Sequence, residues 1–282
     1  MKRVPRRRGL RTVGVALVVA ACGSASSRPS PTGDSTPDAG TDSPIPTESG
    51  SPPPPVSTSW CRGRSETFCD DFDTPALTSK AWTINDTRGT TRVGLPPDSL
   101  DTVNHTSAPN AFVARTPAMA SGGVEILEIQ GGSAAPEGKS HVDADFAFSV
   151  RIGALGGASK VEIARVEGVN PITFASYGLA LVVGASGASL ELKQGARATV
   201  ALPLAAAPTT GSWTRVTIHL GMEVVVNGPP TPITIQIGAA PAETFSLDRG
   251  MGVRPFYRLG LRVSGPSGPC EVTYDDVTYD AR

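Results

Sequence analysis

The chain has 282 residues, nearly balanced charge with 25 Lys and Arg against 26 Asp and Glu, and only 5% aromatic residues. Six of the basic residues fall within the first eleven positions, so the rest of the chain is acidic, with a formal net charge of −7. An acidic surface offers no electrostatic footprint for nucleic acid or anionic lipid, which excludes both as main partners.

The chain opens with a pattern typical of an export signal. Basic residues from Lys2 to Arg11 precede an apolar run from Val13 to Ala21, which is about half the ~20 residues that a membrane-spanning helix requires. Residues 19–22, Val-Ala-Ala-Cys, resemble the bacterial lipobox. The resemblance implies that residues 1–21 are a cleaved lipoprotein signal and that Cys22 carries acyl chains anchored in the lipid bilayer. The alternative is a plain secretory signal with a coincidental cysteine.

The next segment, residues 22–59, is almost entirely Ser, Thr, Pro, Gly, Asp and Ala and contains four consecutive prolines at 52–55. It can bury too little apolar surface to offset the entropy of ordering. We therefore expect a disordered tether, extended by its prolines at ~3.1 Å per residue. The residue after Cys22 is Gly23, whereas an aspartate at this position retains lipoproteins in the inner membrane of enteric bacteria. We expect an exported lipoprotein anchored at the outer membrane or cell surface.

Residues 60–282 change to short β-rich runs separated by Gly and Pro, without helical periodicity. This pattern predicts a single all-β domain, an antiparallel two-sheet β-sandwich. The expected strands are Val124–Gln130, Val142–Ile152, Val161–Val166, Tyr177–Val183, Ser189–Lys193, Trp213–Leu220, Glu223–Val226, Ile233–Ile237, Tyr257–Val263 and Val272–Tyr279.

Alternation along the strands predicts which side chains face the core. In 141–152 the apolar positions 142, 144, 146, 148, 150 and 152 share one face, and His141, Asp143 and Asp145 lie on the other. Two carboxylates two residues apart can bind a cation or carry out acid and base chemistry. The competing interpretation is a solvated outer face, and a concave groove around the pair would favour the functional one.

Four cysteines are present, and three remain if Cys22 carries lipid. An exported protein can oxidise thiols, so we expect one disulfide and one leftover thiol. Cys61 with Cys69 closes a short loop and is the first choice. The rival pairing is Cys69 with Cys270, because each lies just ahead of an Asp-Asp pair. The CxxC spacing of zinc sites is missing.

Four short segments, in order, resemble the concanavalin A-like jelly roll of legume lectins, laminin-G-like modules and many glucanases. They are Phe68-Cys-Asp-Asp-Phe-Asp73, Ser107-Ala-Pro-Asn-Ala111, Trp213-Thr-Arg-Val-Thr-Ile218 and Tyr274-Asp-Asp-Val277. The resemblance spans about residues 68–280 and implies the fold. It does not fix the function, because this fold carries several.

The resemblance implies two kinds of site. Members of the fold often hold a structural calcium through an aspartate of the closing strand, so Asp70, Asp275 and Asp276 are candidate ligands. Hydrogen bonding of these carboxylates to loop amides is the alternative. The glucanases carry Glu-x-Asp-x-x-Glu on one strand, whereas this chain has Glu125-Ile-Leu-Glu128 without the aspartate. Residues three apart project to opposite faces of a regular strand, which argues against a glucanase.

Sugar binding usually uses exposed aromatic side chains. Phe256-Tyr257 is the best candidate, because adjacent strand residues face opposite ways. We place Tyr257 with His141, Asp143 and Asp145 on a ligand face and name no catalytic residue. The preferred hypothesis is a non-catalytic, membrane-tethered protein that binds glycans or acts as an adhesin. The alternatives are a divergent polysaccharide hydrolase or lyase using Asp143, Asp145 or Glu128, and a purely structural envelope protein.

Overall fold

The computed structural model describes residues 59–73, 82–86, 100–120, 124–132, 141–169, 176–194, 199–223, 231–247 and 254–282. The expected signal, Cys22 and nearly all of the tether lie outside these residues. The described ranges hold strands, turns and loops and no helix. They therefore contain no helix that is long and apolar enough to cross a membrane.

Fifteen strands form two antiparallel sheets that pack face to face, which confirms the predicted β-sandwich. Sheet A has the order β13-β12-β11-β6-β15-β4-β3, and β1 also pairs with β15. Its strands are β1 (Phe68–Asp70), β3 (Leu100–Asp101), β4 (Ala111–Thr116), β6 (His141–Leu155), β11 (Trp213–Glu223), β12 (Thr231–Ile237), β13 (Glu243–Leu247) and β15 (Cys270–Ala281).

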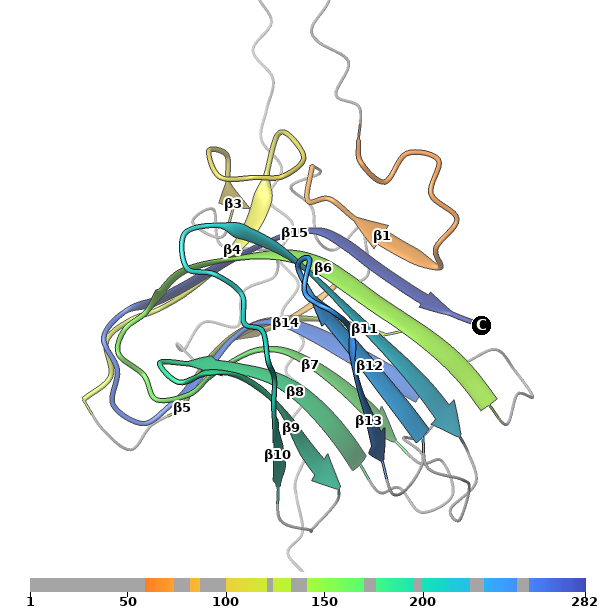
Figure 1. Cartoon of the computed structure of the whole chain (residues 1–282). Coiled ribbons are helices and arrows are strands. Elements are labelled where there is room, and N and C mark those ends of the chain that lie inside the picture. Colours follow the sequence, from red (N-terminus) through yellow and green to blue (C-terminus); the bar gives the residue numbers. More distant parts are fainter. Residues whose placement is uncertain are drawn as a thin grey trace, which may run out of the picture. The chain divides into compact units, whose positions relative to one another are not determined.

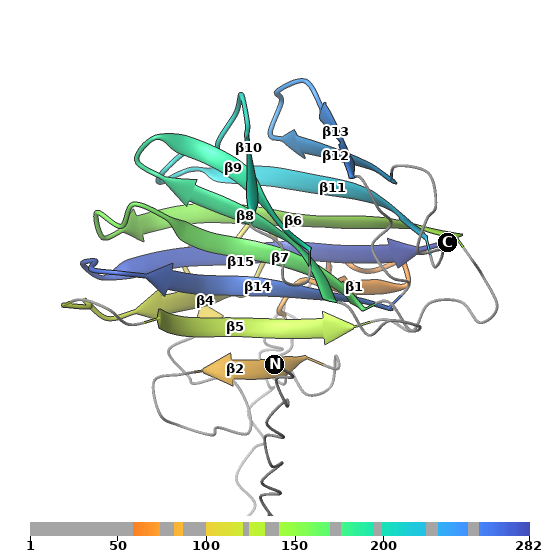
Figure 2. The ribbon, with the colours of Figure 1, turned by 90° about the horizontal axis from the view of Figure 1, so that it is seen from below.

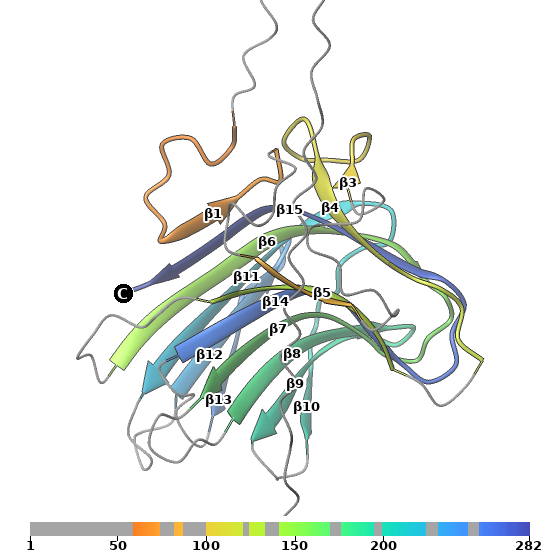
Figure 3. The ribbon, with the colours of Figure 1, turned by 180° about the vertical axis from the view of Figure 1, so that it is seen from behind.

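Sheet B has the order β10-β9-β8-β7-β14-β5-β2, which places β7 and β14 side by side near its middle (Figure 2). Both sheets bend in the same sense, and sheet B lies on the inner side of the bend (Figure 1 and Figure 3). Its strands are β2 (Thr83–Asp86), β5 (Val124–Gly132), β7 (Val161–Val169), β8 (Ser176–Gly184), β9 (Gly187–Gln194), β10 (Val200–Pro203) and β14 (Arg254–Ser264).

The core between the sheets follows the predicted alternation. In β6 all six positions predicted to face inward, from Val142 to Ile152, are buried. In β11 the same holds for Val216, Ile218 and Leu220. Burial of one face of each strand is the main force that holds the sandwich together, at about 25 cal/mol per Å² of apolar surface removed from water. The opposite faces of both sheets are left for polar side chains.

An irregularity in sheet B shapes its open face. In the pairing of β14 with β7, Leu259 lies opposite Ala164 and Arg262 opposite Glu162, so Gly260 and Leu261 together face Ile163. This is a β-bulge, and Gly260 has a φ of 142°, where residues with a Cβ are strained. The Tyr274 hydroxyl reaches across from sheet A, 2.6 Å from the Ile163 carbonyl oxygen and 2.8 Å from that of Gly260. It therefore supplies a hydrogen bond to the carbonyls at the bulge.

Candidate functional site

The open face of sheet B carries a cluster of five charged side chains, which we call the β7/β14 cluster. It consists of Glu162, Arg165 and Glu167 from β7 and Arg258 and Arg262 from β14. On β14 the flanking residues 257, 259, 261 and 263 are buried in the core, so the arginines between them project from the other face. The bulge brings Arg262 opposite Glu162, where a regular strand pairing would not.

Ion pairs join the five side chains of the β7/β14 cluster into one network. Arg165 Nε lies 2.5 Å from Glu162 Oε1, and Arg165 Nη1 lies 3.0 Å from Glu167 Oε1. Arg258 Nη2 donates to the other Glu167 oxygen at 2.9 Å, and Arg262 Nε lies 3.8 Å from Glu162 Oε1. The five side chains of the cluster thus comprise three guanidiniums and two carboxylates.

Arg165 is the centre of this network. Its partial burial disfavours the charge, but hydrogen bonds and attraction from Glu162 and Glu167 outweigh burial and raise the pKa of the guanidinium above its ordinary value. The side chain is 18% exposed and that of Glu162 is 11% exposed. Arg165 is therefore a permanent cation at neutral pH. The arrangement can therefore hold an anion, such as a sugar carboxylate, by charge-assisted hydrogen bonds.

Of the three carboxylates that the enzyme hypothesis named, Glu128 alone lies on a strand that pairs with β14. It lies on β5, where its Cα pairs with that of Gly260. The positions on β5 that pair with Arg258 and Arg262 are Gln130 and Ile126. The backbone of Glu128 thus lies opposite the stretch of β14 between the two arginines. The side chains of Glu125 and Glu128 are outside the described residues.

Asp143 and Asp145 lie elsewhere, on the face of sheet A that points away from sheet B. His219 of β11 lies beside them, with its Nδ1 2.8 Å from Asp145 Oδ1 and its Nε2 3.9 Å from Asp143 Oδ1. Arg282 Nη2 is 3.8 Å from Asp145 Oδ2. The side chains of His219, Asp143 and Asp145 are between 40% and 51% exposed. The side chain of His141 lies outside the described residues.

The expectation that Tyr257 lies on a ligand face is wrong. Its side chain is 1% exposed and stacks on Tyr279 with ring centroids 4.8 Å apart in the core. Phe256 is the member of the pair that leaves the core, and it is half-buried. The alternation argument predicted that one of the two faces outward, but it could not say which, because both side chains are apolar enough for the interior.

The candidate calcium ligands are held by hydrogen-bond donors. Asp70 accepts the Trp82 indole N–H at 2.6 Å and the Phe72 amide at 2.9 Å. Asp275 accepts the amides of Thr106 and Ser107 at 2.7 and 2.9 Å. Donors of this kind satisfy a buried carboxylate without a cation. Within the described ranges no group of three or more His, Cys, Asp and Glu side chains could hold a metal ion.

Asp275 and Asp276 form a buried carboxylate pair that fastens the loop before β4. The Thr106 hydroxyl lies 2.9 Å from Asp275 Oδ2 and 2.6 Å from Asp276 Oδ2. Burial raises the pKa of the Asp275 carboxyl to about 6, with the neighbouring Asp276 charge acting in the same direction and the hydrogen bonds from the Ser107 and Thr106 amides opposing both. We conclude that the pair has a structural role in closing the sandwich.

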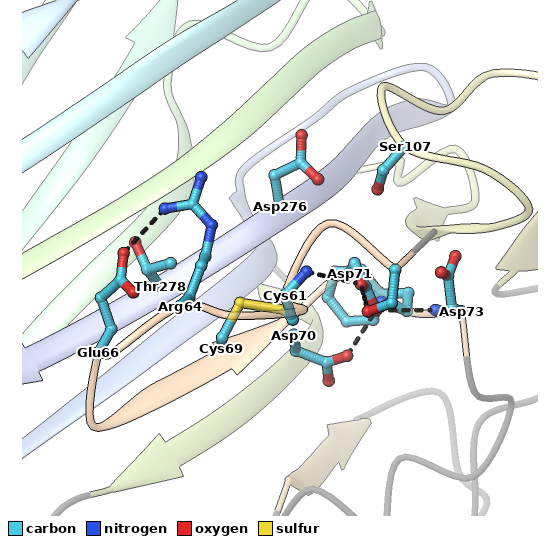
Figure 4. The surroundings of a disulfide bond; sticks show 12 residues. Cys61, Arg64, Glu66, Cys69, Asp70, Asp71, Asp73, Ser107, Asp276 and Thr278 are labelled. Carbon is cyan, nitrogen blue, oxygen red and sulfur yellow. Dashed lines mark hydrogen bonds and ion pairs between the residues drawn. A yellow bond between two sulfur atoms is a disulfide. The ribbon is translucent and has the colours of Figure 1, made fainter. Parts of the chain in front are cut away.

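The structure forms the Cys61–Cys69 disulfide, the first of the two expected pairings (Figure 4). It closes a loop whose last residues pair with β15. Asp71, just after the loop, accepts hydrogen bonds from the Cys61 amide at 3.1 Å and from the Ser59 hydroxyl. The Arg64 guanidinium stacks on the Trp60 ring, 3.4 Å from its centroid. Cys270 is left as a buried free thiol, so the rival pairing is not formed.

No protein-family model matches this sequence, and no curated protein sequence matches it. Solved structures do resemble the fold. An endo-β-1,4-glucuronan lyase from the fungus Trichoderma reesei superimposes with a TM-score of 0.52 at 14% identity, over 77% of this chain and 95% of that one. A family 7 alginate lyase in complex with its product gives 0.51 at 11% identity, over 76% and 100%. An alginate lyase from Chlorella virus gives 0.51 at 10% identity, over 77% and 100%.

The comparisons confirm the concanavalin A-like jelly roll that the four sequence segments predicted. They overturn the preferred hypothesis about function. The similar structures are polysaccharide lyases and not binding modules, so the expectation of a non-catalytic protein is wrong and its enzymatic alternative is favoured. At 14% identity or less, the likeness itself establishes the fold alone.

Sequence reasoning missed the β7/β14 cluster. A local signal is visible in β7, where charged residues at 162, 165 and 167 interrupt an apolar run. The two arginines of β14 follow about 90 residues later, and only the strand order of sheet B brings them beside β7. A cluster built from two strands so far apart in sequence has no motif of its own.

Proposed function

We propose that the chain is a polysaccharide lyase that acts on an acidic, uronate-containing polysaccharide. Two independent observations support this. The whole or nearly the whole of several polysaccharide lyases superimposes on the sandwich. The inner side of the bend carries the three guanidiniums of the β7/β14 cluster, and this second observation carries the proposal.

The chemistry of a uronate lyase explains why guanidiniums are needed. A base removes the proton on the carbon next to the sugar carboxylate, the electron pair forms a carbon–carbon double bond, and the bond to the glycosidic oxygen at the neighbouring carbon breaks. The leaving oxygen takes up a proton. That carbon proton is acidic enough only when the carboxylate charge is neutralised, and paired hydrogen bonds from arginine do this well. We assign this role to Arg258 and Arg262, with Arg165 holding the two glutamates in place.

The base is assigned to Glu128 on the strength of its register opposite Gly260, between the positions that pair with the two arginines. A glutamate is ordinarily ionised at neutral pH, and its carboxylate can accept a proton from carbon once the substrate is aligned. Glu128→Gln keeps the shape and removes the basic oxygen. It should lower kcat by at least about a hundredfold, the usual size of a general-base contribution.

The test is incubation of the purified protein with alginate, glucuronan and a neutral glucan. We expect ultraviolet absorbance from the unsaturated sugar end with an acidic polysaccharide and none with the neutral glucan. Arg262→Gln should reduce kcat/KM by about tenfold or more, since one charge-assisted hydrogen bond is worth that factor. Lys160→Gln is the matched control, because Lys160 pairs with Glu191 at the start of β7, outside the cluster. New reducing ends without the absorbance would contradict the lyase assignment.

The envelope location is part of the proposal. The basic start, the short apolar run and the Val-Ala-Ala-Cys sequence support export and acylation at Cys22, with residues 22–59 as a tether to the membrane and residues 60–282 as the β-sandwich domain. Two acyl chains would suffice for stable anchoring. Labelled palmitate should enter the wild-type chain and not Cys22→Ala, and the variant should appear in the soluble fraction. Equal label in both chains would contradict the anchor.

A further inference from the structure

A depression of about 660 Å³ lies on the outer face of sheet A, on the side of the sandwich opposite the β7/β14 cluster. Strands β4, β6 and β15 supply its walls, including Arg115, Arg151 and Glu271. Its volume falls within the roughly 300–1,000 Å³ typical of small-molecule and cofactor sites. Nothing in the proposed lyase chemistry uses it.

A glycine positions the carboxylate that lines the depression. The pairing of β6 with β15 skips Gly153, with Ala154 opposite Glu271 and Ile152 opposite Val272. A Cβ placed on Gly153 would lie 2.7 Å from Glu271 Oε1. The glycine at this bulge therefore leaves the space that the Glu271 side chain occupies, and both residues line the depression.

The charges around the depression favour an anion. Glu271 Oε2 accepts a hydrogen bond from Arg115 Nε at 2.7 Å, which neutralises the single carboxylate of the lining. Arg151 donates from Nε to the Gly211 carbonyl oxygen at 3.1 Å, and this contact orients its guanidinium on the face. The lining holds two guanidiniums and one carboxylate, and Asp101 of β3 also interacts with Arg115, whereas Arg151 keeps its charge beside a neutral carbonyl.

Apolar groups complete the lining. Pro117, Ala154 and Pro269 also line the depression. A pyranose ring presents C–H groups on its faces and polar groups around its edge, so a site that combines rigid apolar walls with an oriented cation suits a sugar that bears a carboxylate. A bare inorganic anion would make no use of the apolar walls.

We propose that this depression is a second, non-catalytic site that binds a uronate residue of an acidic polysaccharide. The inference rests on the proposed function for its substrate class. Arg115 and Arg151 hold the carboxylate, and the two prolines and Ala154 contact the ring. A polymer held on the outer face stays at the protein after each cleavage on the inner face, because the second contact raises the local concentration of substrate.

Electrophoresis of the purified full chain, in the cold, through native gels containing alginate or glucuronan measures this binding without reliance on turnover. Arg115→Gln with Arg151→Gln should weaken retention by about tenfold, since it removes charge-assisted hydrogen bonds to the carboxylate. Arg62→Gln with Lys160→Gln is the control, because it changes the net charge equally at exposed positions outside both sites. Backbone amide shifts of Gly153 and Ala154 on titration with a short oligouronate should locate the contact.

Three results would overturn the proposal. They are unchanged retention of the Arg115 and Arg151 double variant, an equal loss in the control, which would mean diffuse charge attraction, and equal retention of the wild type by a neutral glucan. Failure of the lyase proposal reads differently. In that case no acidic polysaccharide yields an unsaturated product, while the gel still retains the wild type more strongly than the double variant.

Discussion

Tyr274→Phe tests the link between the two sheets and the bulge beneath the β7/β14 cluster. The hydroxyl of Tyr274 is fully buried and serves the carbonyl oxygens of Ile163 and Gly260, both at the bulge. Removing it leaves buried acceptors without this donor, which costs about 1–3 kcal/mol. The free energy of unfolding, measured by urea titration with matched slopes, should fall by this amount. Activity should fall as well, because the bulge places Arg262 opposite Glu162.

Tyr279→Phe provides the matched control. Tyr279 lies on the same strand and is equally buried, but its hydroxyl has no hydrogen-bond partner among the described residues. Replacing it removes a buried hydroxyl that forms no stabilising hydrogen bond, so the free energy of unfolding should stay unchanged or rise slightly. Equal losses in both variants would refute the reasoning, because the cost would then come from the ring edge and its packing and not from the bonds to the bulge.

Three further predictions concern stability. The pKa of Asp275 rises from 3.8 to about 6 on folding, so the folded chain keeps this proton where the unfolded chain has lost it. Its contribution to stability therefore declines as the pH rises from about 4 to 6, and Asp275→Asn should remove that slope from urea titrations; an unchanged slope would be a contradiction. Replacing Cys61 and Cys69 by Ser should cost about 2–3 kcal/mol for a loop this short, and an unaltered thermal midpoint would count against it. Arg165→Gln should destabilise far more than Lys160→Gln in the same titration, because it leaves two partly buried glutamates without their main partner.

The fold was largely predictable from local pattern. Each strand of a two-sheet sandwich has one buried face, so apolar and polar residues alternate along strands such as β6 and the sequence alone shows it. Most of the strands that escaped prediction lie at sheet edges, and β4, which lies between β15 and β3, is the exception. In β10 and β13 few side chains are buried, because an edge strand contacts the core on one flank only. Local apolar alternation is weak there for that reason.

The candidate site was less predictable, because it depends on which strands become neighbours. Asp143 and Asp145 are close in sequence and were easy to find, yet they lie on the face of sheet A that points away from the core. Arg165 and Arg258 become neighbours only through the strand order of sheet B. Neither the hydrophobic period nor residue spacing contains that order. The burial of Tyr257 was unpredictable for a related reason, because its ring packs on Tyr279 of the opposite sheet.

Mass spectrometry of the fragments released from alginate or glucuronan tests the central claim most directly. An elimination adds no water across the broken linkage, so the account predicts that one new end of each cut is lighter than the hydrolytic fragment by the mass of one water molecule. Fragments of the full hydrolytic mass, or polysaccharides that all remain intact under conditions where the chain is folded, would contradict it.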